Sequence, residues 1–153
     1  MRIYTTLNKI RACKPCGLKE YDTTGFRKLL NFLGKTTSDD EPLKFSTILE
    51  SNDIRDALWC LRSICPEYNR EVRLFAADCA ESVLHLFEKK YPNDNRPRLA
   101  IKAARKFANG EINESELKTA AAAARAAART AYAAAAYAAE RKIQGEILIK
   151  YFG

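Results

Sequence analysis

The stretch NREVRLFAADCAESVLHLFEKKYP, residues 69–92, has the clearest periodicity in the sequence. Its apolar residues recur at intervals of three and four, which is the spacing of an amphipathic helix. The predicted buried face consists of Val72, Phe75, Ala76, Cys79, Val83, Leu86 and Phe87. We therefore predict that this segment is the central helix of the core.

Helices are also predicted on both sides of this segment, and no stretch alternates in the manner of a β-strand. Capping residues, glycines and prolines bound them at about 5–12, 23–34, 43–51, 51–64, 93–110 and 113–150. Gly34 and Gly110 are predicted to follow helix ends, and Asn113 with Glu116 to form a capping box.

This pattern predicts an all-α protein with a single domain over residues 1–153. We expect a bundle of about six to seven helices. Its parts are basic N-terminal helices at 1–35, central helices at 45–110 and a long alanine-rich helix at 113–150.

Alanine makes up 15 of the 24 residues in TAAAAARAAARTAYAAAAYAAERK, residues 119–142. Alanine is the strongest helix former, because it loses no side-chain entropy on ordering. We expect the methyl face of this helix to pack closely against another helix. Arginine and tyrosine are common at interface hot spots. The exposed face is therefore predicted to be a partner-binding ridge made of Arg125, Arg129, Tyr132 and Tyr137.

Positive charge is unevenly distributed in this chain, whose formal net charge is +7. Residues 1–35 hold eight basic and two acidic side chains, whereas residues 36–70 hold four basic and seven acidic ones. In the helix after the core helix, Arg98, Lys102 and Arg105 share one face. We predict that these three also contact a partner. Because cations of this kind suit phosphate groups, a nucleic-acid-binding accessory protein is the alternative function.

The five cysteines are predicted to be free thiols, since their number is odd and no export signal opens the chain. Cys13 and Cys16 have CxxC spacing. A redox dithiol would need a preceding strand, and a zinc site would need further ligands from elsewhere in the chain. We interpret CKPCG as a helix-ending turn and expect neither a metal nor a cofactor.

No side-chain pattern predicts an enzyme. His85 is the only histidine, and we interpret it as bonded to a neighbouring residue on its own helix. Asp78 is interpreted as half of a structural ion pair, with Arg105 or Arg125 of a neighbouring helix as its partner. We therefore expect no catalytic residues.

Two long strings resemble known families. REVRLFAADCAESVLHLFEKKYPNDNRPRLAIKAARKFANGEINESEL, at 70–117, is similar to the Imm-5-like immunity proteins, whose members continue into alanine-rich helices. LGKTTSDDEPLKFSTILESNDIRDALWCLR, at 33–62, is similar to a set of phage and prophage proteins. Together the resemblances cover about residues 30–140.

The resemblance implies an intracellular protein that neutralises a toxin by binding it. We expect a non-catalytic inhibitor that acts by occlusion. It would be an immunity-like protein against a toxin or, if the gene is viral, an inhibitor of a bacterial defence complex such as an anti-CRISPR protein. The protein partner is what this resemblance implies. The sequence shows no membrane span and no export signal, so we expect a cytoplasmic location.

Overall fold

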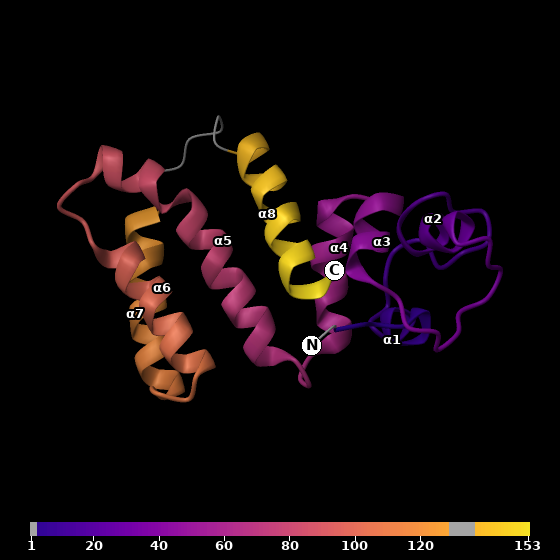
Figure 1. The fold of residues 1–153 in the computed structure, drawn as a ribbon, viewed down its shortest axis with the longest axis horizontal. Helices are drawn as coiled ribbons and strands as arrows, with labels where there is room; N and C mark the ends of the chain where they lie inside the picture. The colour runs from indigo at the N-terminus through magenta and orange to yellow at the C-terminus, as the bar shows by residue number, and fades with distance from the viewer. Residues whose placement is uncertain (1–2, 129–136) are drawn as a thin grey trace. The chain divides into compact units, whose positions relative to one another are not determined.

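Helices form the regular structure of this chain (Figure 1). The computed structural model describes residues 3–128 and 137–153. In chain order, the elements are α1 (Leu7–Ala12), α2 (Gly25–Phe32), α3 (Phe45–Ser51), α4 (Ile54–Cys60), the 3-10 helix η1 (Leu61–Ile64), α5 (Asn69–Lys90), α6 (Arg96–Ala108), α7 (Glu114–Ala128) and α8 (Tyr137–Phe152). One isolated bridge joins Thr5 to Leu43, and the described residues contain no strand. The predicted all-α fold is confirmed.

The chain divides into two compact units. The first comprises Met1–Tyr68 with Leu148–Gly153, and the second comprises Asn69–Ile147. The last residues of helix α8 therefore belong to the first unit, and its other residues belong to the second. The single domain over 1–153 stays a prediction.

The core of the first unit combines side chains from its short helices with the C-terminal end of α8. Its most deeply buried large side chains are Leu7, Ile10, Leu29, Phe45, Ile48, Ile64, Leu148 and Phe152. The rings of Phe45 and Phe152 lie with centroids 5.3 Å apart and planes inclined at 55°. Thr5 is buried as well, and its hydroxyl lies 2.6 Å from that of Ser63. A polar contact thus joins the N-terminal segment to η1.

The loop between α1 and α2 turns at Gly17, whose φ of +77° lies in the left-handed region. A Cβ there would collide with the backbone carbonyl oxygen of Thr24 and lie 2.9 Å from the nitrogen of Phe26. Gly34 also has a positive φ, +66°, yet a Cβ at that position would meet no atom within 4 Å.

We expect Gly17→Ala to lower the free energy of unfolding by more than about 2 kcal/mol, because backbone strain adds to a collision. Gly34→Ala is the matched control. It should lower the free energy of unfolding by only about 1 kcal/mol, which is the cost of placing alanine in the left-handed conformation. Chemical denaturation measures both changes, and equal losses would contradict the close approach at Gly17.

In the second unit, α6 packs against both α5 and α7. Ala77 and Leu84 of α5 form a buried cluster with Ile101 of α6. The predicted buried face of α5 is confirmed at Phe75 and Cys79, and it is wrong at Ala76 and Leu86, which are exposed. The reason is that α6 contacts α5 along the line through Ala77 and Leu84, a line that the apolar spacing of the sequence did not select.

Several predicted helix ends are confirmed. The backbone N–H of Asn113 donates to the Glu116 carboxylate at 2.9 Å, and the N–H of Glu116 donates to the Asn113 side chain at 3.0 Å. Gly34 and Gly110 follow the C-caps of α2 and α6 with positive φ. These residues form the capping box and glycine stops that the sequence indicates.

The alanine-rich segment is described as two helices, α7 and α8, and residues 129–136 between them lie outside the described ranges. Helix α8 continues through Gly145 without a break. In α7, Ala120, Ala121 and Ala124 are partly buried, whereas Ala122 is exposed. None of the described helices is long and apolar enough to span a bilayer.

Candidate functional site

The predicted basic face of α6 lies against α5, where acidic side chains hold two of its three cations. Arg98 donates two hydrogen bonds of 2.7 Å to the Glu88 carboxylate. Arg105 lies 2.8 Å from an oxygen of Asp78 and 2.5 Å from one of Glu81. The ion pair predicted for Asp78 is confirmed, with Arg105 as its partner. Such multipoint contacts fix the orientation of a planar guanidinium.

Further contacts join the two helices toward the start of α5. The guanidinium of Arg73 lies 4.7 Å from the centre of the Phe107 ring. Arg70 donates to the side-chain oxygen of Asn109 at 3.1 Å. We call this row of contacts, together with the two ion-pair groups and the Ile101 cluster, the α5–α6 seam. Because its charged groups meet partners inside the unit, the seam stabilises the helix pair.

The seam gives a prediction for the titration of Glu88. Hydrogen bonding by Arg98 holds the pKa of Glu88 below its usual value of 4.5. A lowered pKa in the folded state stabilises the protein above that usual value, and the gain is lost as pH falls through the lowered pKa. In Arg98→Ala we expect the pKa of Glu88 to rise toward 4.5, as measured by NMR titration of its carboxyl group. An unchanged value would show that the pair is absent in solution.

Two of the predicted contact residues, Lys102 and Arg125, are exposed. Neither forms an ion pair with another side chain in the described ranges. On α7, Lys118 meets Glu114 one turn earlier, at 2.9 Å. Arg125 therefore stands exposed near the end of a helix whose other exposed residues there are mainly alanines.

The other residues of the predicted ridge fall where the structure gives no side-chain positions. Arg129 and Tyr132 lie outside the described ranges. Tyr137 is the first residue of α8, and its side chain is not described. The ridge as a whole therefore stays a prediction, with Arg125 as its described member.

All five cysteines are free thiols. Among the side chains that the structure describes, no three or more of His, Cys, Asp and Glu gather as a metal site would require. Burial, followed by the charge of Asp56, raises the pKa of the Cys60 thiol to about 12, so this thiol stays protonated at neutral pH. His85 is exposed, and its Nδ1 lies 3.1 Å from the carbonyl oxygen of Ser82. The predicted neighbour-bonded histidine is confirmed.

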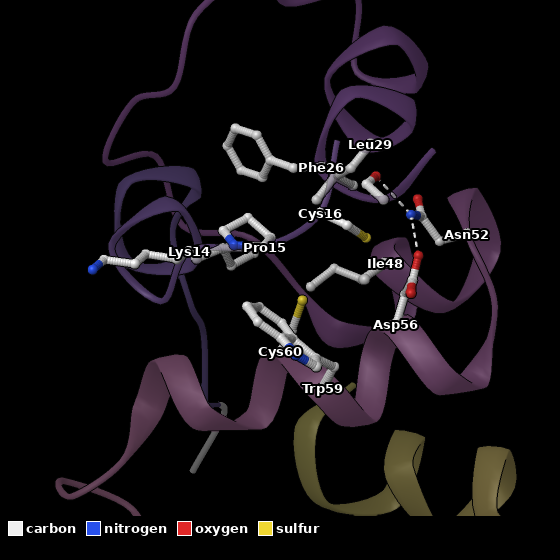
Figure 2. Close-up of a pocket in the computed structure, with 12 residues that line it drawn as sticks. Lys14, Pro15, Cys16, Phe26, Leu29, Ile48, Asn52, Asp56, Trp59 and Cys60 are labelled. Atoms are coloured by element: carbon white, nitrogen blue, oxygen red, sulfur yellow. Dashed lines mark hydrogen bonds between the residues drawn. The ribbon is translucent and has the colours of Figure 1, made fainter. Parts of the chain in front are cut away.

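A pocket in the first unit was not predicted from the sequence (Figure 2). Its volume is about 160 Å³, and its walls come from α1, the following loop, α2, α3, α4 and Asn52 between the last two helices. No pattern in the sequence groups its residues as one site, and the more than forty positions between Cys16 and Cys60 carry no spacing signal. Contacts between segments this far apart are set by the tertiary fold.

Comparison with known proteins identifies one family. The family model for Imm-5 like putative immunity protein matches residues 62–144, and the chain belongs to this family. The family indicates an immunity-type role with a protein partner such as a toxin, and immunity proteins are in general not catalysts. The matched segment contains the α5–α6 seam and α7 but not the pocket. Neither the curated proteins nor the solved structures gave a match to this chain.

Proposed function

We propose that the chain neutralises a protein toxin by binding it and covering its active surface. The observation that supports this proposal is membership of the Imm-5-like immunity protein family. The family match covers residues 62–144, which include most of the second unit. The inhibitor acts by occupancy in the cytoplasm, without a catalytic step and without a cofactor.

The proposed contact surface lies on α7, where Arg125 projects from a surface with few competing side chains. Arg129, Tyr132 and Tyr137 extend this surface along the sequence. Lys102 adds an exposed cation on α6. Positive groups of this kind favour a toxin whose active surface is acidic, because complementary charge accelerates association.

Arg98 and Arg105 take a different role in this proposal. Their guanidinium groups are bound to carboxylates of α5, so they position α6 instead of donating to a partner. This pairing leaves Lys102 as the exposed cation of the predicted face. Nucleic-acid binding through the exposed basic side chains is the second candidate, and a phage-encoded inhibitor of a defence complex is a variant of the first.

Co-expression tests the proposed function. Each toxin encoded beside an Imm-5-like gene is produced in bacteria with this chain or with an empty vector, and survival is counted. We expect full rescue against one toxin and recovery of an equimolar complex by gel filtration. Failure against all of them, together with nonspecific DNA binding that falls steeply with salt, would favour the nucleic-acid function. Protection of phage or plasmid from a defence system would favour the phage-inhibitor variant.

A further inference from the structure

The pocket of the first unit is small and mainly apolar. Its volume of about 160 Å³ is close to that of an engineered apolar cavity of about 150 Å³ that binds benzene. Apolar lining comes from Ile10, Pro15, Phe26, Leu29, Ile48 and Trp59. The sulfur atoms of Cys16 and Cys60 point toward the space between these residues (Figure 2). One aromatic ring is therefore the largest group that the pocket accommodates.

A carboxylate lies at one end of the pocket in a fixed orientation. The Asn52 amide donates to the Gly25 carbonyl oxygen at 2.8 Å and to Oδ2 of Asp56 at 2.7 Å (Figure 2). The amide oxygen of Asn52 accepts from the Ser51 hydroxyl at 2.8 Å. In the described part of the chain, Asn52 is the one side chain that donates a hydrogen bond to the Asp56 carboxylate, and the backbone N–H of Asp56 donates to Oδ1 of Asp53. The second carboxylate oxygen of Asp56 thus remains available to a donor.

Neither lysine close to the pocket forms an ion pair with Asp56, whereas Arg62, 4.4 Å from the centre of the Trp59 ring, lowers the pKa of Cys60 against the larger effect of Asp56. Lys14 lines the pocket, but its side chain extends away from the carboxylate (Figure 2). Lys28 donates to the backbone carbonyl of Asn52 at 3.4 Å and not to Asp56. The raised pKa of Cys60 has burial as its main cause and the charge of Asp56 as the next. The negative potential of Asp56 therefore reaches the pocket wall.

We infer that this pocket binds a small organic cation: a protonated primary amine carried on a single aromatic ring. The ring would displace water from the apolar lining around Leu29, Ile48 and Trp59, and the ammonium group would donate to Asp56. An apolar site with one convergent polar group is the usual composition of a small-ligand pocket. All of these residues precede position 62, so this inference does not depend on the toxin proposal.

Benzylamine tests the inference on the full chain, with benzyl alcohol as its neutral analogue. Trp59 is the only tryptophan, so fluorescence excited where tyrosine does not absorb reports on the pocket. We expect saturable binding of benzylamine and about tenfold weaker binding of the alcohol, which lacks the charge-assisted hydrogen bond. No saturable signal, or equal affinity for the two compounds, would overturn the inference.

Asp56→Asn removes the charge and keeps the shape, so benzylamine should bind it about as weakly as benzyl alcohol binds the natural protein. Glu50→Gln, which removes an exposed carboxylate outside the pocket lining, is the matched control and should bind normally. Alkylation of the natural protein supplies a test that needs no variant. Benzylamine should slow the modification of Cys16 and leave that of exposed Cys65 unchanged. Equal rates at Cys16 with and without the amine would contradict binding in the pocket.

Discussion

Phe152→Ala should lower the free energy of unfolding by about 3–5 kcal/mol, the usual loss when a buried phenylalanine is truncated to alanine. The side chain of Phe152, in the last turn of α8, is 0% exposed, and its ring packs against Phe45. The change removes this aromatic contact and leaves a cavity that the surrounding side chains fill only in part. Urea denaturation followed by circular dichroism measures the loss.

Ile149→Ala is the matched control, because Ile149 lies on the same helix and is 48% exposed. It should change stability by no more than about 0.5 kcal/mol. Small and equal effects of the two substitutions would show that the end of α8 does not belong to the core of the first unit.

The second large effect concerns binding. Arg125→Ala combined with Arg129→Ala should weaken toxin binding by about 2 kcal/mol or more, which is roughly a thirtyfold rise in Kd. The physical reason is that the proposed complex would lose two long side chains, from an alanine-rich segment, that bury area and donate hydrogen bonds to the toxin. The melting temperature should stay nearly the same, since Arg125 is exposed and has no ion-pair partner in the described ranges. Titration calorimetry and thermal melts measure the two quantities.

Arg105→Ala is the opposite control. Arg105 contacts Asp78 and Glu81 across the α5–α6 seam with 34% of its side chain exposed, so its removal should lower stability by about 1 kcal/mol and leave Kd unchanged. If instead Arg105→Ala weakens binding and the double variant lowers stability, the contact surface and the structural surface have been assigned the wrong way round.

Helix ends were predictable from the sequence because their signals are local. The Asn113–Glu116 capping box needs residues three positions apart, and the glycines after α2 and α6 need only a left-handed conformation at one residue. The ion pair of Asp78 was also predictable, because Asp78 lies beside the apolar face of its helix and neighbouring helices carry arginines. Its partner was narrowed to two arginines, and the structure selects Arg105.

The packed face of α5 was predicted less well, because apolar spacing was the only signal used. The line of α5 that meets α6 alternates apolar Ala77 and Leu84 with acidic Glu81 and Glu88. Carboxylates in these positions predict that this line of the helix is exposed to solvent. The line is packed instead, because arginines of α6 lie opposite the carboxylates. The complementary charges of two helices were therefore the missing information.

The pocket could not be predicted for a different reason. Its residues come from four helices, the loop between α1 and α2, and Asn52 between α3 and α4, and no two of these segments share a periodic pattern. The CxxC spacing in the sequence pairs Cys16 with Cys13. In the structure Cys60, from α4, lines the pocket together with Cys16.

Neutralisation by binding is tested most directly by titrating the purified chain against the activity of the toxin that it rescues. We predict that toxin activity falls linearly and reaches its minimum at one equivalent of the chain, with the masses of both proteins unchanged. Inactivation at a small fraction of one equivalent, or a changed mass of the toxin, would show that the chain acts as a catalyst and would contradict the account.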